Sequence, residues 1–220
     1  MSDKRTIRIT GTGDLRLRPD TTRITMTLEG REGEYAGAVA LSAADTEKLK
    51  TALAALGFRR EEVKTTRFDV DAEYESYKEH GAYRQRLTGY RYSHALYVEF
   101  PSDRERLGKV LAVLASCEAR PVFRISYTVR DGEGAKNALL EKAVADAGEK
   151  ARVLARAAGV TLGEVQSIDY SWSRLDLEVM PVAPIGADMC MKSSVNSLDL
   201  DVEPDDILLS DTVTVLWAIG

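Results

Sequence analysis

The sequence predicts an α+β fold, with a mixed or largely antiparallel sheet and helices packed on one of its faces. Segments of alternating polar and apolar residues, typical of half-buried strands, lie on either side of long stretches with the 3.6-residue period of amphipathic helices. Two of these helical stretches end at a glycine, Gly57 and Gly159, and a strand pattern follows each glycine. The order strand–helix–strand–strand therefore occurs twice, which favours helices on one side of a sheet.

The first elements expected are strands. Residues 6–10 alternate, Gly11-Thr12-Gly13 interrupts the pattern, and the alternation resumes from Leu15 to Leu28. Glycines within a strand pattern indicate a bulge or a tight reversal. A dinucleotide-binding loop is excluded, because Arg16 stands in the place of its third glycine and a strand follows where a helix should begin.

The central part of the chain predicts two helices and a hairpin. One helix runs from Tyr35 to Leu56, and strands at residues 63–74 and 90–100 enclose a polar tip. Ser102-Asp103-Arg104-Glu105 matches a capping box, with the serine at the N-cap, and opens the second helix. Its core-facing residues are expected to be Leu107, Val110, Leu111 and Leu114.

The last third of the chain predicts a strand at residues 122–129, a long helix that ends at Gly159, and strands at 165–172 and 207–219. The helix carries a stripe of mostly small residues, which allows a helix to lie close to a sheet: Ala135, Leu139, Ala143, Val144, Ala147, Ala151, Leu154 and Ala158. Residues 174–206, rich in polar residues and proline, are expected to be the least regular part.

The two helix–glycine–strand junctions also match in detail. Gly57 aligns with Gly159, and Glu62-Val63 aligns with Glu164-Val165 at the same distance. We interpret this as an internal duplication, with repeat units at about 6–100 and 121–220, inside a single domain that spans residues 1–220. The alternative is that unrelated junctions of this kind resemble one another.

Composition limits the class of protein. The 220 residues are 44% hydrophobic and 30% charged, with a net charge of −5, which argues against global disorder and against general electrostatic binding to nucleic acid or anionic lipid. No signal-peptide pattern is visible at the start, and the longest nearly apolar stretch, residues 110–117, is too short to span a bilayer. We expect a cytoplasmic protein, in which a Cys117–Cys190 disulfide is disfavoured.

Several motifs resemble the SIMPL-domain family. Residues 9–24, Ile-Thr-Gly-Thr-Gly through Arg-Pro-Asp to Ile24, are similar to the family's opening pattern of two spaced glycines followed by Pro-Asp. Leu87-Thr88-Gly89-Tyr90 resembles its strand entry, and residues 143–151, with Asp146 and Lys150, resemble its Ala-Val-x-Asp-Ala-x-x-Lys-Ala helix. These landmarks occur in the family's order.

The resemblance implies little about chemistry. The family has no agreed catalytic residues to carry over to this chain. Its bacterial members are often exported and associated with envelope or oxidative-stress phenotypes, one periplasmic immunogenic member forms ring-like assemblies, and the animal namesake is a signalling adaptor. We therefore expect a stress-related protein, and the missing signal-peptide pattern sets this chain apart from exported members.

No catalytic constellation or cofactor site is found. The two histidines, His80 and His94, have no partner at metal-ligand or catalytic spacing, so we interpret them as a solvated loop residue and a sheet position. The acidic run 199–206 departs from a calcium loop, because Pro204 and Ser210 stand where glycine and glutamate are required. We predict a protein that is not an enzyme and needs no cofactor.

Two alternatives remain for the long loop. Met189-Cys190-Met191, with Met180 nearby, offers sulfur donors that suit Cu(I). The same residues can serve as an apolar anchor that holds the loop against the body, which we favour. A stress-related role in binding a small ligand or metal through residues 174–206 is therefore the second hypothesis.

The first hairpin carries the strongest sign of an interaction. Six of the nine tyrosines fall there, interleaved with arginines. Such residues are favoured at protein interfaces and can also stack on single-stranded nucleic acid, but the glutamates among them disfavour nucleic acid. We predict a self-associating protein, a homo-oligomer that can also have a protein partner, with these candidate interface residues: Tyr74, Tyr77, Tyr83, Arg84, Arg86, Met189 and Met191.

Overall fold

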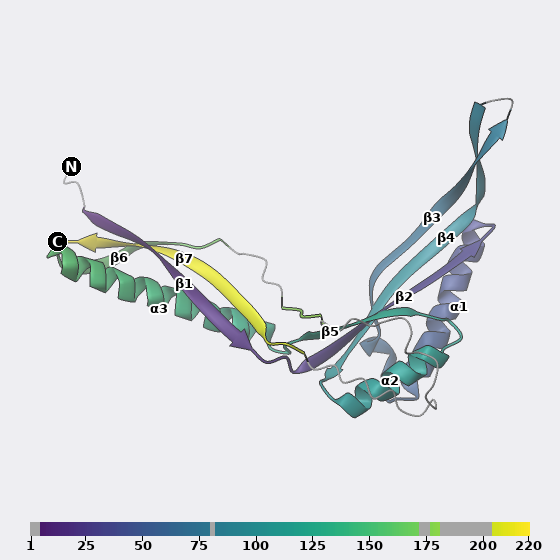
Figure 1. Ribbon diagram of the computed structural model, residues 1–220, viewed down its shortest axis with the longest axis horizontal. Helices are drawn as coiled ribbons and strands as arrows, with labels where there is room; N and C mark the ends of the chain where they lie inside the picture. The colour runs from purple at the N-terminus through teal and green to yellow at the C-terminus, as the bar shows by residue number, and fades with distance from the viewer. Residues whose placement is uncertain (1–4, 80–81, 172–176, 181–203) are drawn as a thin grey trace. The chain divides into compact units, whose positions relative to one another are not determined.

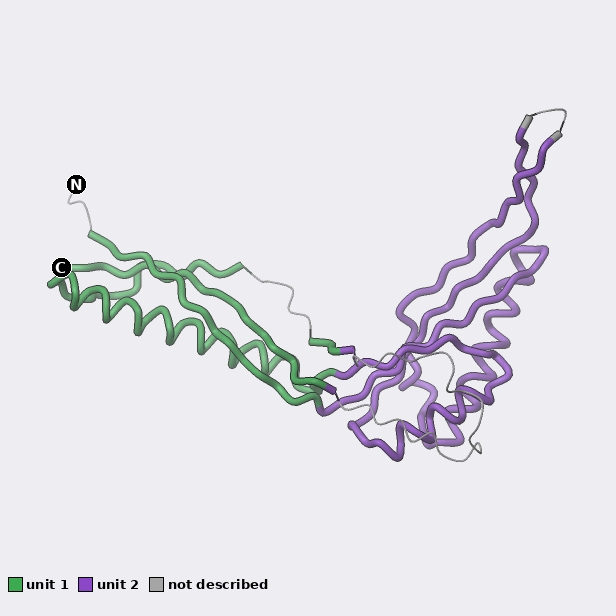
Figure 2. Tube along the Cα trace, in the orientation of Figure 1, with its two compact units in different colours: residues 1–19, 128–179, 205–220 green, residues 20–127, 180–204 purple. Residues whose placement is uncertain are grey.

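The computed structural model describes residues 5–79, 82–171, 177–180 and 204–220, and the chain divides into two compact units. Unit 1 comprises residues 1–19, 128–179 and 205–220, and unit 2 comprises residues 20–127 and 180–204 (Figure 2). Each unit has helices alongside an antiparallel sheet, so the predicted α+β class is confirmed, although the strands form two sheets. In the described part of the chain, no helix is both long and apolar enough to cross a membrane.

Unit 1 is a three-stranded sheet with one long helix on one face (Figure 1). The strand order is β1 (Thr6–Leu17), β7 (Ile207–Ile219), β6 (Leu162–Asp169), and both pairs are antiparallel. Helix α3 (Gly132–Ala158) buries a stripe against the sheet: Ala135, Leu139, Ala143, Ala147, Ala151 and Ala155. Val144 and Leu154, expected in that stripe, are 40% and 49% exposed, because they lie beside the contact line.

The bulge expected at Gly11-Thr12-Gly13 is wrong. Strand β1 pairs with β7 residue by residue from Thr6 to Leu17, without a register shift. The glycines are needed because α3 lies directly on them. A Cβ atom on Gly11 would lie 2.1 Å from the carbonyl oxygen of Ala143, and one on Gly13 would lie 2.2 Å from that of Leu139. The two glycines that interrupt the alternating strand pattern therefore lie where a helix packs closely on the strand.

Unit 2 is a four-stranded sheet in the order β3 (Lys64–Glu79), β4 (Ala82–Pro101), β2 (Thr21–Glu32), β5 (Val122–Thr128). Helices α1 (Tyr35–Ala54) and α2 (Arg104–Ser116) pack against it, and a short 3₁₀ turn, η1 (Arg60–Glu62), precedes β3 (Figure 1). The core joins alternate residues of β2 and β4 to the helices, with fully buried side chains that include Ile24, Met26, Leu28, Leu49, Leu53, Leu96, Val98, Val110 and Leu111.

The bounds of the two helices in unit 2 differ in detail from those predicted. Helix α1 ends at Ala54, and its first apolar residues, Tyr35 and Val39, are 55% and 37% exposed. The N-cap of α2 is Asp103, not Ser102, since the Asp103 carboxylate accepts a 3.0 Å hydrogen bond from the Arg106 amide. Ser102 instead places its hydroxyl 3.2 Å from that of Thr22 on β2. The predicted α2 core residues are buried.

The two units share a pattern of strand pairing. In unit 2, β4 lies between β2 and β3, and in unit 1, β7 lies between β1 and β6. The strand that precedes α3 along the chain is β5, however, and β5 lies beside β2 in unit 2. The compact units are thus interleaved in sequence and do not follow the boundaries 6–100 and 121–220. Duplication stays a prediction.

Candidate functional site

The hairpin of β3 and β4 is longer than its composition suggested. Strand β2 accompanies β4 only as far as the pair Glu32–Tyr90, whereas β3 and β4 stay paired out to Glu79–Ala82. Most of the polar tip expected between the strands at 63–74 and 90–100 is therefore itself paired strand. We call residues 73–79 and 82–89 the ribbon. It projects beyond β2 as two strands (Figure 1).

A bulge marks the base of the ribbon. Glu73 pairs with Gly89 and Tyr74 with Leu87, so Thr88 is an extra residue on β4. The Thr88 hydroxyl donates a 3.0 Å hydrogen bond to the carbonyl oxygen of Glu73, and Gly89 has a φ of 151°. A side chain at Gly89 would also meet the Glu32 carbonyl oxygen at 2.6 Å, so this position requires glycine.

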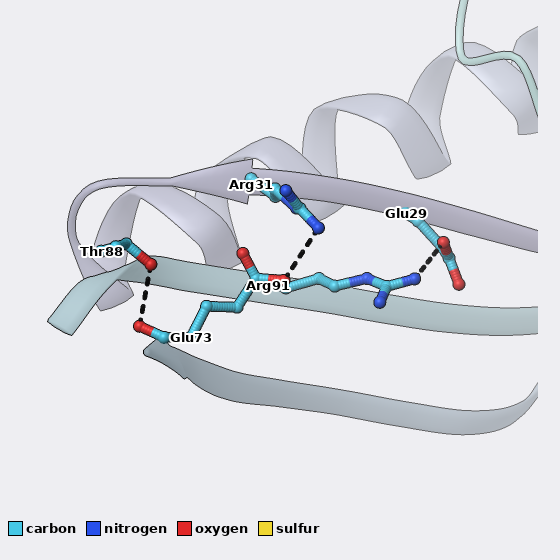
Figure 3. A network of polar contacts seen from close by, with 5 residues as sticks. All are labelled: Glu29, Arg31, Glu73, Thr88 and Arg91. Atoms are coloured by element: carbon cyan, nitrogen blue, oxygen red, sulfur yellow. Dashed lines mark hydrogen bonds and ion pairs between the residues drawn. The ribbon is translucent and has the colours of Figure 1, made fainter. Parts of the chain in front are cut away.

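Charged side chains fix the base of the ribbon to β2 (Figure 3). Arg31 and Arg91 are direct cross-strand neighbours, a pairing of like charges that alone would be unfavourable. Each has a carboxylate partner: Arg31 contacts Glu73 at 3.1 Å and Arg91 contacts Glu29 at 2.5 Å. The hydrogen bond to Glu29 is the main cause that raises the pKa of Arg91.

A shallow hollow of about 340 Å³ lies at this base, lined by Arg31, Glu32, Gly33, Glu73, Thr88, Gly89 and Tyr90. Its lining contains the ion pair between Arg31 and Glu73. The hollow therefore lies where the ribbon leaves the sheet.

The cross-strand register sorts the ribbon side chains onto two faces. Opposite residues share a face, and the face alternates at each step along a strand. The pairs Tyr74–Leu87, Ser76–Gln85 and Lys78–Tyr83 therefore lie on one face, which we call the apolar face. The pairs Glu75–Arg86 and Tyr77–Arg84 lie on the other, which we call the charged face.

The apolar face is open to solvent. Tyr74 is 62% exposed, Leu87 48% and Tyr83 81%, and only the ammonium of Lys78, 5.9 Å from the Tyr83 ring, lies over any of these side chains among the described contacts. Because these three large side chains are exposed and remote from the core, they bury little apolar surface when the chain folds. Contact with another surface would bury them.

The charged face is satisfied within the ribbon. Arg86 binds the Glu75 carboxylate at 2.8 Å, and its guanidinium lies 5.7 Å from the ring centre of Tyr77. The hydrogen bond that Arg86 donates to Glu75 is the main cause that raises the pKa of Arg86. Of the predicted interface residues, Tyr74 and Tyr83 thus lie on one face and Tyr77, Arg84 and Arg86 on the other. Met189 and Met191 lie outside the described residues.

The remaining hairpin tyrosines have structural roles. Tyr92 is fully buried, and its hydroxyl donates a 2.6 Å hydrogen bond to Asp45 on α1. Burial and this carboxylate raise the pKa of Tyr92. Tyr97 stacks under the guanidinium of Arg23 at 4.7 Å, and Tyr90 meets the edge of Tyr35. The tyrosine-rich sequence therefore serves both the core of unit 2 and the ribbon.

His94 is a sheet position, as expected, and its ring is bonded on both sides. Its Nδ1 lies 3.0 Å from the Thr46 hydroxyl and 3.4 Å from that of Ser42, both on α1. Its Nε2 lies 2.9 Å from the Thr65 hydroxyl on β3. Burial, and secondarily the charge of Lys50, lower the pKa of His94. The ring therefore links α1 to β3 through these hydroxyl groups.

The other candidate positions lie mostly outside the described residues. These are His80, the sulfur-bearing residues 189–191 and most of the acidic run, from residue 199 to 203. Asp206, which is described, binds Arg16 on β1 at 2.6 Å. Within the described ranges, no group of three or more histidine, cysteine or carboxylate side chains is arranged to hold a metal ion.

A comparison with models of protein families matches residues 7–217 to SIMPL, a protein family of unknown function (DUF541). The chain belongs to the SIMPL family. No curated protein matches it. In this SIMPL chain two of the motifs that suggested the family meet in unit 1: the amide of Thr12, between the two glycines of β1, donates a 2.7 Å hydrogen bond to Asp146 of α3. Lys150 binds the same carboxylate at 2.7 Å and is the main cause of the lowered pKa of Asp146.

Sequence reasoning missed two features of the ribbon. Leu87 was not among the candidates, although it lies opposite Tyr74 and is nearly half exposed. The contact between Arg31 and Glu73 was also missed, because the two residues are far apart in sequence.

Proposed function

We propose that this SIMPL chain is a non-enzymatic protein that self-associates, and that the apolar face of the ribbon is its main contact surface. The observation that carries the proposal is the exposure of Tyr74, Tyr83 and Leu87 on one face of a two-stranded extension. An isolated two-stranded hairpin is marginal in water, and contact with another chain would stabilise it. Tyrosine is also among the residues enriched at the centres of interfaces.

The contrast between the two faces supports a docking role over an ordinary exposed hairpin. The charged face contains its own ion pair and cation–π contact. The apolar face has three large side chains and a polar pair, Ser76 and Gln85, which is the mixture of anchors and hydrogen-bonding groups typical of contact surfaces. Nucleic acid is disfavoured because Arg86 is neutralised by Glu75 and lies on the opposite face from Tyr74 and Tyr83.

Light scattering on purified protein tests this proposal. The wild-type chain should have a mass well above the 24.2 kDa of one protomer at micromolar concentration. Changing Tyr74, Tyr83 and Leu87 together to serine should reduce the mass to that of the protomer, since the apolar contact is removed. The matched control is Tyr77→Ser, which removes a tyrosine from the charged face and should leave the mass unchanged. A wild-type protein that is a strict monomer would refute self-association.

The second hypothesis is a stress-related small-ligand or metal-binding protein that uses residues 174–206. It rests on the sulfur-bearing and acidic composition of that segment. Metal analysis of protein purified without chelators tests it, with Cys190→Ser as the variant and Cys117→Ser, a change at a buried position of unit 2, as the control. Stoichiometric copper that is lost only with Cys190 would favour this hypothesis over assembly.

A further inference from the structure

The first part of α1, from Tyr35 to Ala44, contains no charged side chain, although 30% of the residues in the chain are charged. Ala38 and Ser42 face the sheet and are buried. Residues two positions away from these lie about 200° round the helix, and they are exposed in the described part of the chain. We call the exposed residues of this part the uncharged face of α1: Tyr35, Ala36, Val39, Ala40, Ala43 and Ala44. A helix segment that is apolar on all sides is usually covered on all sides, so this face suits a contact with another surface.

The apolar face of the ribbon lies on the same side of the sheet as α1. Tyr92 is buried beneath α1, and Val70 is its cross-strand neighbour, so Val70 faces the helix side. The extra residue of the bulge lies on β4, so the alternation along β3 continues unbroken from Val70 to Tyr74. Helix α1 begins at the end of the sheet from which the ribbon projects (Figure 1), and the ring of Tyr35 meets that of Tyr90 there, with 5.7 Å between the ring centres. The apolar face therefore continues the surface on which α1 lies, beyond the start of the helix.

The two exposed surfaces match in length and differ in side-chain size. From Tyr74 to Lys78, the residue opposite Tyr83, the apolar face spans about 13 Å at the rise of a strand. The uncharged face of α1 spans about 15 Å at the rise of a helix. The width of two strands, about 10 Å, also equals the diameter of a helix. The ribbon presents large side chains and the helix presents mainly the methyl groups of alanines, so the large side chains can pack between the small ones.

We propose that two copies pair about a two-fold axis, so that the ribbon of each copy lies on the uncharged face of α1 of the other. This inference rests on the proposed self-association and names the surface that covers the apolar face of the ribbon. In a two-fold pair each contact occurs twice, so both surfaces of both copies are covered and the assembly is a closed dimer. Each α1 then lies between the sheet of its own copy and the ribbon of the other.

The exposed area supports a second copy as the partner. Tyr35, Tyr74 and Tyr83 are 55%, 62% and 81% exposed. At roughly 200 Å² for each side chain, they offer about 400 Å² of tyrosine surface per copy. This is half of the roughly 800 Å² that each partner contributes to a stable interface, before Leu87, Val39 and the alanines are counted. A reciprocal contact uses all of this surface, whereas contact through the ribbon alone leaves the uncharged face of α1 open.

The lack of charge favours the same partner. An uncharged surface gains no electrostatic complementarity from a charged partner, whereas a second copy brings surfaces that are equally uncharged. An anionic lipid surface is disfavoured, because the exposed Glu32 and Glu34 come directly before the uncharged face of α1.

Disulfide trapping with the full chain tests which surfaces meet. In a chain with Cys117→Ala and Cys190→Ser, one variant carries Ala40→Cys, on the uncharged face of α1, and a second carries Gln85→Cys, on the apolar face of the ribbon. On oxidation, an equal mixture should give a linked pair that contains one chain of each variant, whereas each variant alone should stay unlinked. The matched control uses Arg84→Cys, on the charged face, in place of Gln85→Cys, and should give no linked pair.

A chain that carries both Ala40→Cys and Gln85→Cys tests the two-fold symmetry. Its linked product should have twice the mass of the 24.2 kDa protomer and nothing larger should form, because a two-fold pair is closed. A ladder of larger linked species would overturn the two-fold contact. A linked pair from either single-cysteine variant alone would also overturn the inference, since like surfaces would then meet, and so would an equal mixture that stays unlinked.

Inserting a charge on α1 separates this inference from the proposed function. Ala40→Glu should reduce the mass found by light scattering to that of the protomer, because a carboxylate would be buried under the ribbon of the other copy. Thr51→Glu, an exposed position farther along the same side of α1, should keep the wild-type mass. If the serine variant of the ribbon dissociates but Ala40→Glu does not, self-association stands and the contact with α1 is wrong. A wild-type chain found only as a protomer would instead contradict the proposed function, on which this inference depends.

Discussion

The close approach of α3 to β1 makes Gly11→Ala the sharpest test of unit 1. The new methyl group would lie 2.1 Å from the carbonyl oxygen of Ala143, 2.5 Å from the amide nitrogen of Ala147 and 2.7 Å from its Cβ. The first two are backbone atoms of a helix and cannot rotate away, so the helix itself must move. We expect a loss of about 3 kcal/mol in the free energy of unfolding, the upper part of the range for overpacked cores.

The assay is urea denaturation followed by the fluorescence of Trp217, which is 7% exposed in the core of unit 1. Changing Trp172, the other tryptophan, to phenylalanine in all variants leaves Trp217 as the single reporter. The matched control is Gly148→Ala within α3, where the nearest atom to the new methyl is the end of the Arg152 side chain at 3.7 Å. This change should stabilise unit 1 by about 1 kcal/mol, because alanine is the better helix former.

A double variant separates backbone from side-chain crowding. Trimming Ala147 to glycine removes the contact at 2.7 Å but leaves the carbonyl oxygen of Ala143 in place. Gly11→Ala combined with Ala147→Gly should therefore be no more stable than Gly11→Ala alone. If Gly11→Ala unfolds at the wild-type urea concentration, α3 does not lie on β1 as closely as described, and the reasoning for both glycines of β1 is wrong.

Three further predictions concern unit 2. The pKa of His94 is lowered in the folded chain, so just below pH 6.5, its ordinary pKa, the unfolded chain binds more protons than the folded one. The contribution of His94 to the free energy of unfolding should therefore be complete above about pH 6.5 and should decline as the pH falls toward the folded pKa. In a plot of the urea midpoint against pH, His94→Gln should flatten this decline. Asp103→Ala should cost about 1 kcal/mol through the lost cap of α2, whereas Ser102→Ala should cost less, and equal losses would contradict the placement of the cap. Replacing residues 76–86 by a short turn should leave the thermal midpoint within a few degrees of wild type, because the described residues of this segment pair with one another, except that Arg86 pairs with Glu75. A large drop would show that the ribbon supports the core.

The elements themselves could be predicted from sequence because their signals are local. The stripe of α3 and the apolar positions of α2 follow the helical period, and the structure buries their central residues, such as Leu139 and Leu111. Errors arose where two local signals competed. Ser102 and Asp103 both suit an N-cap, and only the position of the Arg106 amide decides between them. Residues 75–89 were expected as a polar tip outside the strands, because side-chain polarity does not show whether a backbone pairs with another strand.

The arrangement of the candidate surface was harder to predict. Tyrosine and arginine content singled out the β3–β4 hairpin as a candidate, but Tyr74 and Arg86 could not be placed on opposite faces without the register of β3 against β4. A bulge at Thr88 changes that register by one residue, and a change of one residue exchanges the faces.

Sequence alone determined the family, the α+β class and the order of helices and strands, because motif spacing and hydrophobic period are carried by neighbouring residues. Tertiary structure decided which strands share a sheet. Strand β5 precedes α3 in the chain and yet lies beside β2, while the first strand of unit 1 comes from the N-terminal segment. Which strands pair depends on burial and hydrogen bonding between residues that are far apart in sequence. A local sequence pattern therefore cannot predict the pairing. The same holds for Gly11 and Gly13, whose purpose became clear only when Ala143 and Leu139 of α3 were found above them.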